Sequence, residues 1–380
     1  MSLSRRFFLM TLVALAGCQR NANRHPVSGD LIERLNLSDA ELRQAVAHSP
    51  SSEIESTLQK VSRTLDLVHV EKMPEYLPNW IAFHAVLMYS EHAYPNWRAG
   101  NKINENLERI FTVIQKSDTQ NNGAFGLRGG LPYPRYSGPY FMQEHHSDQF
   151  LLYFSMAGGT LDAPLSIDDK EYTFQNVLDR SLLEARIINE LAYTVMVYSK
   201  FLEPGMKWQN KFGETISLAV LLEKLLVTPE KTCLGTHRLG ALARVYARKE
   251  LKEDKEIAKL WPELERQVFE ALVRLKQSQR PDGSFEPPGM VAGSQTQEHI
   301  DIYFSGHSLE WITFLGEKYC HEDWVTRGVD YLTSVVATTY KQTFRNLDVA
   351  KTREAHFDFD GLCHATSALK RWQDHILHFF

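Results

Sequence analysis

The sequence predicts an all-α protein built from helical hairpins, and three observations point to this. Apolar residues recur at three- and four-residue spacing along most of the chain, which is the pattern of amphipathic helices. One segment recurs weakly after 44 residues, a length that fits one helical hairpin. No series of regularly spaced alternating strands is present, so an all-β fold is not expected.

The helices are expected where the apolar spacing is clearest. These segments are residues 31–47, 54–67, 80–89, 103–114, 146–156, 182–201, 218–226, 238–247, 261–275, 308–315, 329–340 and 366–379. A loop rich in Gly, Pro and Tyr is expected over residues 121–140, and its tyrosines could stack on sugar rings or pack the loop. The mixed run 244–259 is interpreted as a solvated outer helix face.

The repeat consists of residues 169–178 and 213–222. Each copy places a hydroxyl residue, Thr173 or Ser217, where a helix cap belongs before an apolar run. Repeated hairpins of this size either stack into a solenoid or close into a ring.

Four histidines form a second pattern. His146, His237, His307 and His364 each lie at the expected start of an apolar helix, and the last three follow a glycine within three residues. If these helices form the inner layer of a ring, their N-termini converge and the four imidazoles line one cavity.

Two short motifs resemble known families. Residues 279–285, Gln-Arg-Pro-Asp-Gly-Ser-Phe, resemble the turn of the squalene-cyclase and prenyltransferase repeat, which joins outer and inner helices of an α/α toroid. Residues 306–311, Gly-His-Ser-Leu-Glu-Trp, resemble the Gly-His-x-x-Glu helix start of N-acylglucosamine 2-epimerases, which are also α/α toroids. Together they imply an α/α toroid, as a complete or incomplete ring.

The histidines suggest acid–base chemistry, because imidazole titrates near neutral pH. We expect His237 and His307 to be the acid–base pair, with Arg238 and Glu310 orienting substrate or tuning a pKa. The epimerase resemblance implies the acid–base role only for His307, together with Glu310. Further substrate-binding candidates are His146, Asp148, Arg238, Trp311 and His364. The alternative is that each histidine caps its helix or bonds nearby backbone and performs no chemistry.

Metal binding is a weaker alternative, so no resident metal or other cofactor is expected. Cys363-His364 and Cys233, four residues before His237, offer ligands that zinc accepts. Lanthionine cyclases and protein prenyltransferases resemble this in part, but Ala365 stands where the cyclase run has glycine, and no Cys-x-x-Cys pair exists. Cys233, Cys320 and Cys363 are expected as buried thiols, with one disulfide or a metal site as the alternatives.

The first residues predict export. Arg5 and Arg6 precede an apolar run of about ten residues, too short to span a bilayer. The arginines resemble a twin-arginine signal, and Leu15-Ala16-Gly17-Cys18 resembles a lipobox, which implies cleavage before Cys18 and a lipid on its sulfur. Gln19 favours the outer membrane, facing the periplasm, by resemblance to Gram-negative sorting. The expected organisation is a signal peptide over 1–17, a tether over 18–29 and one domain over 30–380.

Charge excludes one class of partner. Cleavage removes Arg5 and Arg6, two of 42 basic residues, and none of 47 acidic ones, so the net charge changes from −5 to −7. A nucleic-acid binder would need a basic face, so nucleic acid is not an expected partner.

Two hypotheses therefore remain for the function. One is an envelope enzyme that acts on a sugar or glycan by histidine acid–base chemistry. The other is a non-enzymatic envelope protein that binds a ligand or a protein partner; a zinc-dependent enzyme is a further alternative. Side chains of His237 and His307 more than about 10 Å apart would exclude direct acid–base cooperation, because proton transfer needs hydrogen-bond reach.

Overall fold

The computed structural model describes residues 35–46, 49–71, 79–89, 91–101, 105–117, 123–135, 147–187, 190–228, 235–287, 297–350 and 353–378. The expected signal peptide, Cys18, the tether, His146 and Cys233 lie outside these ranges. None of the described helices is both long enough and apolar enough to cross a membrane.

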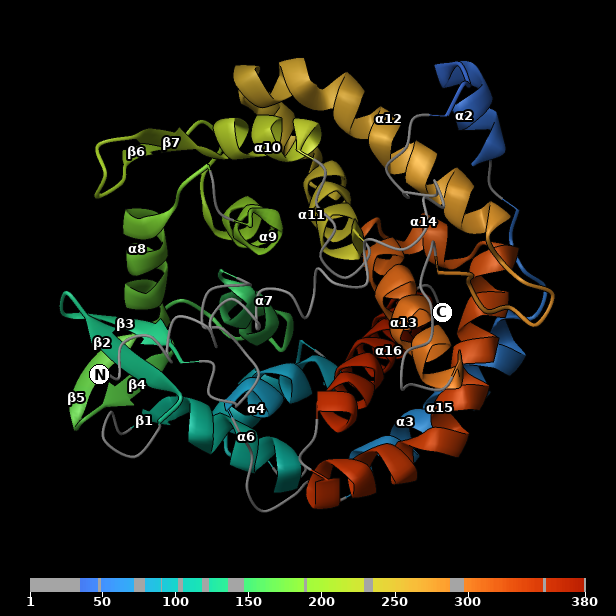
Figure 1. Ribbon diagram of the computed structural model, residues 1–380, viewed down its shortest axis with the longest axis horizontal. Helices are drawn as coiled ribbons and strands as arrows, with labels where there is room; N and C mark the ends of the chain where they lie inside the picture. Colours follow the sequence, from blue (N-terminus) through green and yellow to red (C-terminus); the bar gives the residue numbers. More distant parts are fainter. Residues whose placement is uncertain are drawn as a thin grey trace, which may run out of the picture.

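The described chain is mostly helical, with a group of helices in the middle and others around it (Figure 1). The central helices are α4 (Asn79–Ala85), α7 (Gln149–Met156), α9 (Ala192–Phe201), α11 (Thr236–Ala247), α13 (Gln297–Phe314) and α16 (Arg353–Leu377). Each contacts the next in this order, and α16 also contacts α4. They are nearly all buried, so side chains from distant parts of the sequence meet in the interior.

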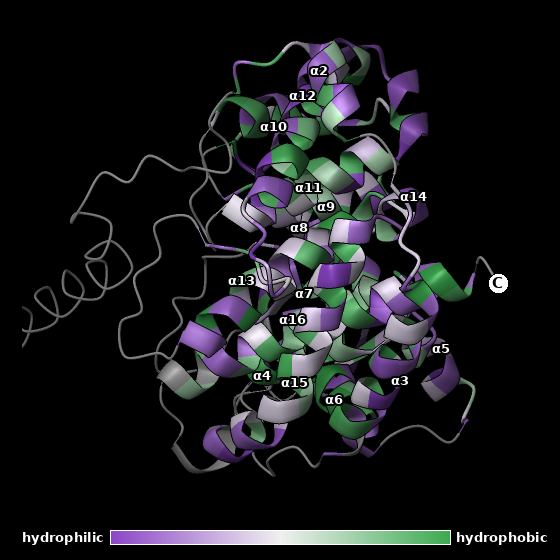
Figure 2. Cartoon of the chain, turned by 90° about the vertical axis from the view of Figure 1, so that its right-hand side faces the viewer, coloured by the Kyte–Doolittle hydropathy of each residue, from purple (hydrophilic) through white to green (hydrophobic). Residues whose placement is uncertain are grey.

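The outer elements cover this central group. They include α2 (Asp39–Ala45), α3 (Ile54–Val70), α6 (Glu105–Gln115), α8 (Phe174–Glu184), α10 (Leu218–Val227), α12 (Lys255–Gln277) and α15 (Asp323–Ala350). Shorter helical pieces are α5 (Ala93–Arg98), α14 (Glu317–Cys320), η1 (Val86–Met88) and η3 (Lys249–Glu253). Helices such as α3 and α15 alternate hydrophilic and hydrophobic residues, as helices with one solvent face do (Figure 2).

Three small sheets show that the expected all-α toroid is wrong. β1 (Lys116–Ser117), β4 (Pro164–Ile167) and β5 (Lys170–Thr173) form one sheet. β2 (Phe125–Arg128) pairs with β3 (Leu131–Pro134), and β6 (Lys207–Gln209) pairs with β7 (Thr215–Ser217). Strands of two to four residues are too short to show the alternation on which strand prediction rests.

The turns explain two of these hairpins. Gly129 and Gly130, at φ 61° and 79°, make the two-residue connection between β2 and β3. Asp168 and Asp169 also have positive φ, 49° and 60°, in the equally short turn between β4 and β5, a conformation that aspartate tolerates better than most residues.

The 44-residue repeat proves to be a hairpin followed by an outer helix. Thr173 ends β5 and caps α8 in a capping box with Asn176, and Ser217 ends β7 and caps α10 by accepting a hydrogen bond from the Val220 amide. The predicted caps are therefore confirmed. The single helix expected over 182–201 is wrong, because α8 ends at Glu184 and α9 begins at Ala192.

The segment 279–285 is a tight turn after α12. Gln279 and Phe285 form an isolated bridge, and Gly283 has φ 93°. The Asp282 carboxylate accepts hydrogen bonds from the Ser284 amide (3.0 Å) and hydroxyl (2.7 Å).

Candidate functional site: a buried histidine cluster

Four histidines meet in the interior, and we call His84, His237, His307 and His364 the histidine cluster. They come from α4, α11, α13 and α16, and all are buried. The ring centroids of His237 and His307 are 5.6 Å apart, and those of His307 and His364 are 3.7 Å apart. His84 joins at 6.1 Å from His364. The distance required for cooperation between His237 and His307 is therefore satisfied.

Close packing of α13 against α16 brings His307 and His364 together. A Cβ on Gly306 would lie 2.7 Å from the backbone nitrogen of Ala365, and one on Gly361 would lie 3.2 Å from the Tyr303 Cα. Only glycine lets the two backbones approach so closely.

These glycines were misread in the sequence as signals of helix starts. His237 is the second residue of α11 as expected, but His307 and His364 lie inside α13 and α16. A helix N-terminus therefore does not set the charge of those two rings, because the dipole effect fades within the first turn.

His307 is a buried base. Its Nδ1 lies 2.8 Å from the Tyr303 carbonyl oxygen, which can only accept, so Nδ1 donates and the neutral ring has its lone pair on Nε2. Burial, together with His364 and His237 nearby, holds the pKa of His307 well below its usual range. Nε2 is buried and has no hydrogen-bond partner among the described residues.

His364 has the opposite charge state. Burial alone would lower its pKa, but Glu310 and Asp360 outweigh burial and raise the pKa to about 10. Its Nδ1 donates to Glu310 Oε2 at 2.7 Å, and its Nε2 lies 3.4 Å from Asp360 Oδ1. The ring is therefore an imidazolium at neutral pH.

Glu310 is the carboxylate that anchors this pair. Burial would raise its pKa, but His364 and a hydrogen bond from the Ser367 hydroxyl (2.6 Å) hold that pKa below its usual value. Asp360, between His84 (3.3 Å) and His364, also has a lowered pKa: its burial is outweighed chiefly by those two rings. The neutral ring of His307 thus stacks on the imidazolium of His364, which Glu310 and Asp360 contact.

Two tyrosines and a glutamine continue the network. The Tyr193 hydroxyl lies 2.7 Å from the Tyr153 hydroxyl and 3.1 Å from His237 Nε2. Gln149 donates to the Tyr153 hydroxyl at 2.8 Å and lies 3.1 Å from His84 Nε2. These contacts connect His237 to His84 through Tyr193, Tyr153 and Gln149.

Several residues of the site were not predicted from the sequence: His84, Gln149, Tyr153, Tyr193 and Glu190. The Glu190 carboxylate lies 3.6 Å from His237 Nδ1. One signal was available, because Gln149, Tyr193 and His237 are successively 44 residues apart, the period of the repeat. Asp360, which also contacts the cluster, lies within α16.

A small cavity borders the histidine cluster. It has a volume of about 20 Å³ and is lined by residues that include Tyr193, His237, His307, Glu310 and Trp311. About 10–15 Å³ is enough for one water molecule, so the described residues enclose room for one water or hydroxyl group. Trp311 was predicted to bind substrate, and its buried indole Nε1 has no hydrogen-bond partner among the described residues.

The cluster fits proton transfer better than a metal ion. One nitrogen each from His237, His307 and His364 can be chosen so that all lie within 4.8 Å of one another. However, the rings of His307 and His364 are stacked at an interplanar angle of 29°, and imidazole lone pairs lie in the ring plane, so they do not converge on one ion. A ring that is an imidazolium also cannot act as a ligand.

The cysteines add no metal site within the described chain. Cys320 and Cys363 are both buried and free, as expected for thiols outside a disulfide. Burial raises the pKa of Cys320 to about 12 and that of Cys363 well above its usual value, which disfavours the thiolate that zinc requires.

Two other predicted residues lie outside the cluster. Arg238 donates to the Leu225 and Leu226 carbonyls (2.8 and 3.0 Å) and to Gln267 (2.5 Å), so it ties α11 to α10 and α12 rather than contacting a ligand. Asp148 precedes α7 and accepts a hydrogen bond from Thr194 at 2.6 Å, and burial raises its pKa.

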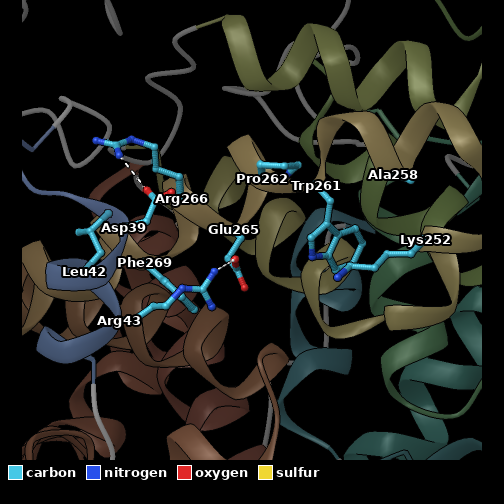
Figure 3. Close-up of a pocket in the computed structure, with 10 residues that line it drawn as sticks. All are labelled: Asp39, Leu42, Arg43, Lys252, Ala258, Trp261, Pro262, Glu265, Arg266 and Phe269. Atoms are coloured by element: carbon cyan, nitrogen blue, oxygen red, sulfur yellow. Dashed lines mark hydrogen bonds and ion pairs between the residues drawn. The ribbon is translucent and has the colours of Figure 1, made fainter.

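A larger cavity of about 360 Å³ lies between α2 and α12, away from the histidines (Figure 3). Two ion pairs cross it, Arg43 with Glu265 at 2.5 Å and Arg266 with Asp39 at 3.0 Å. Lys252 lies over the Trp261 ring at 4.6 Å. These pairs attach α2 to the body, so we interpret this groove as a packing joint.

Comparison of the chain with family models, with curated proteins and with solved structures finds no match in any of the three. The function must therefore be argued from the site alone.

Proposed function

We propose that the protein is an acid–base enzyme in which His307 is the base and His237 returns the proton. The observation that carries this is the unpartnered, buried Nε2 of His307, whose protonation is disfavoured and whose tautomer is fixed by the Tyr303 carbonyl.

The surroundings support each part of this role. His307 Nε2 can accept a proton from a group of hydroxyl size in the neighbouring cavity. The imidazolium of His364, held by Glu310, supplies positive charge where the substrate becomes negative. His237, linked to Tyr193, is placed to deliver a proton from another side. His307 and His237 thus both line one small space, and the His364 imidazolium stacks on the His307 ring.

We propose a sugar or a cell-envelope glycan as the substrate class, as in the sequence hypothesis. The cavity admits only the reacting group, so the rest of such a substrate lies outside the space that the described residues enclose. Tyrosine hydroxyls beside a buried base suit a hydroxylated ligand.

The test is exchange of carbon-bound hydrogen. The purified protein is incubated in D₂O with a panel of reducing and N-acetylated sugars, and loss of each C–H signal is followed by NMR. We expect exchange with at least one sugar and a rate lowered about 100-fold or more in His307→Gln, the typical contribution of a positioned base. His321→Gln is the matched control, since His321 pairs with Glu317 and does not belong to the histidine cluster, and it should leave the rate unchanged.

Two outcomes would reject the enzyme hypothesis. Equal exchange in wild type and His307→Gln would remove the histidine from the chemistry. Saturable binding of a sugar by calorimetry, without exchange or other turnover, would support the alternative of a ligand-binding envelope protein.

We also propose that the chain is exported and anchored through lipid on Cys18 at the outer membrane, facing the periplasm. The support is the order of Arg5-Arg6, the short apolar run and Leu-Ala-Gly-Cys. Mass spectrometry of the mature N-terminus tests it, since an unmodified Cys18 or an uncleaved Met1 would contradict the anchor.

A further inference from the structure

Three basic residues lie two turns further along the central helices, each seven residues after a residue of the histidine cluster or its network. Lys200 follows Tyr193 by seven residues, Arg244 follows His237 by seven, and Arg371 follows His364 by seven. Seven residues correspond to about 10 Å along an α-helix. We call Lys200, Arg244 and Arg371 the basic layer. It lies about two helical turns from the level of the histidine cluster.

Phe314 contacts both arginines of the basic layer. It ends α13 and itself follows His307 by seven residues. The Arg244 guanidinium lies 4.4 Å from the Phe314 ring centroid and that of Arg371 lies 4.9 Å from it, so two cations share one aromatic ring. The two arginines are half-buried and Lys200 is exposed, so each residue retains some surface in contact with solvent.

The basic layer has no carboxylate partner within ion-pair distance among the described residues. Lys200 donates to the Ser155 carbonyl at 2.7 Å, and Arg371 donates to the Thr313 hydroxyl at 3.2 Å. Arg244 Nε is buried without any hydrogen-bond partner in the described chain. Two of these cations thus touch helix C-terminal turns, which favour positive charge, and neither has a direct ion pair with a carboxylate of the described residues.

The lowered pKa values of Arg244 and Lys200 reflect burial and repulsion between the cations of the basic layer. Burial and Arg371 lower the pKa of Arg244 to about 9, and burial, Arg244 and Arg371 lower the pKa of Lys200 to about 8. The nearby acids act only at a distance: Glu310 on both arginines, Glu91 on Lys200 and Arg371, and Asp374 on Arg371. Glu310 is already bonded to His364 and Ser367.

We propose that the basic layer binds a phosphate-type oxyanion, either free phosphate or the phosphate of a small phosphomonoester. Such an anion supplies several acceptor oxygens, and guanidinium groups match them with paired donors. A cavity of about 450 Å³ adjoins Lys200 and is lined also by Ser155, Phe201 and Glu91 but by neither arginine, so it gives room for the organic part of a phosphomonoester and not for its phosphate. This inference stands apart from the proposed chemistry at the histidine cluster.

The experiment measures phosphate binding by isothermal calorimetry and thermal unfolding, with ionic strength held constant by chloride. We expect saturable binding of inorganic phosphate at one site and a raised melting temperature. Arg244→Gln should weaken binding at least about tenfold, as the loss of a charge-assisted hydrogen bond does. Lys224→Gln, which removes an exposed lysine of α10, should bind phosphate as the wild type does.

The stability of Arg244→Gln is not expected to affect the measurement of phosphate binding. Removing one of three repelling charges should leave Arg244→Gln at least as stable as the wild type when phosphate is absent. Glycerol 3-phosphate, compared with glycerol, distinguishes the two sources: tighter binding than inorganic phosphate indicates a phosphomonoester, and equal or weaker binding indicates the free ion.

Two results would overturn the inference. One is a phosphate effect no larger than that of chloride at equal ionic strength. The other is a variant Arg244→Gln that is destabilised without phosphate and binds phosphate unchanged, since Arg244 would then be a purely structural residue.

Discussion

Replacing Glu310 with glutamine should show how much the buried ion pair contributes to stability and to the charge of His364. Glu310→Gln keeps the shape of the side chain but removes the charge that bonds His364 Nδ1 at 2.7 Å. We expect the pKa of His364 to fall from about 10 toward or below 7, because burial then faces only Asp360 as an opposing charge.

The structure sets the size of the effect. The rise in the pKa of His364 from 6.5 to about 10 corresponds to at most about 5 kcal/mol of net attraction, shared between Glu310 and Asp360. Breaking a buried pair by removing one partner costs about 3–5 kcal/mol. We therefore expect the free energy of unfolding to fall by about 3 kcal/mol.

The pH dependence has a defined sign. The raised pKa of His364 stabilises the fold fully below pH 6.5, and this contribution is lost as the pH rises through about 10. The lowered pKa of Glu310 stabilises the fold above its ordinary 4.5, and this contribution is lost at more acid pH. The difference between wild type and Glu310→Gln should thus be largest between about pH 4.5 and 6.5 and should shrink in alkali.

Urea unfolding across pH and NMR titration of labelled histidine provide the measurements. The matched control is Glu317→Gln, since Glu317 is exposed and 3.8 Å from His321, and such surface pairs contribute about 0–1 kcal/mol. The reasoning is refuted if the His364 pKa in Glu310→Gln remains near 10, or if the two variants lose equal stability.

Three other predictions concern packing, metal and thiols. Gly306→Ala should destabilise the protein by about 1–3 kcal/mol in urea unfolding, because its Cβ would lie 2.7 Å from the Ala365 backbone. The control Gly240→Ala, with neighbours at 3.5 Å or more, should be neutral or stabilising. Equal effects of the two variants would contradict the close packing of α13 against α16. Elemental analysis should find less than one zinc per chain, and stoichiometric zinc lost in His307→Gln would reverse our choice between acid–base and metal chemistry. Peptide mapping after thiol labelling should find Cys320 and Cys363 unmodified until urea unfolds the protein, since both are buried with raised pKa values; rapid labelling of either in the native protein would count against this burial.

Much of the helical content and part of the site could be predicted from the sequence. Amphipathic spacing located helices such as α3 and α6 to within a few residues, and the hydroxyl residues Thr173 and Ser217 were identified as caps because that chemistry is local. The meeting of His237, His307 and His364 was also anticipated, but on the expectation that all three begin inner helices of a ring, and only His237 lies at a helix start.

The predictions that were wrong concern features that depend on contacts between residues far apart in the sequence. Gly306 and Gly361 look like helix starts in the sequence, and only the proximity of α13 and α16 explains them. The strands are held by pairing across two to four residues, which leaves no periodic signal. The charges of His307 and His364 are opposite because of Glu310 and Asp360, and no local pattern distinguishes the two rings.

The last described helix, α16, contributes to both the histidine cluster and the basic layer. α16 supplies Asp360, His364, Ser367 and Arg371, and it packs on α3 from near the start of the described chain. During synthesis on the ribosome, Glu310 emerges before α16, which carries the His364 imidazolium that bonds it at 2.7 Å. A chain truncated before residue 353 would therefore lack more than a surface helix: Glu310 would lose the imidazolium of His364, and we expect the chain to be degraded rather than to accumulate as a partly active fragment.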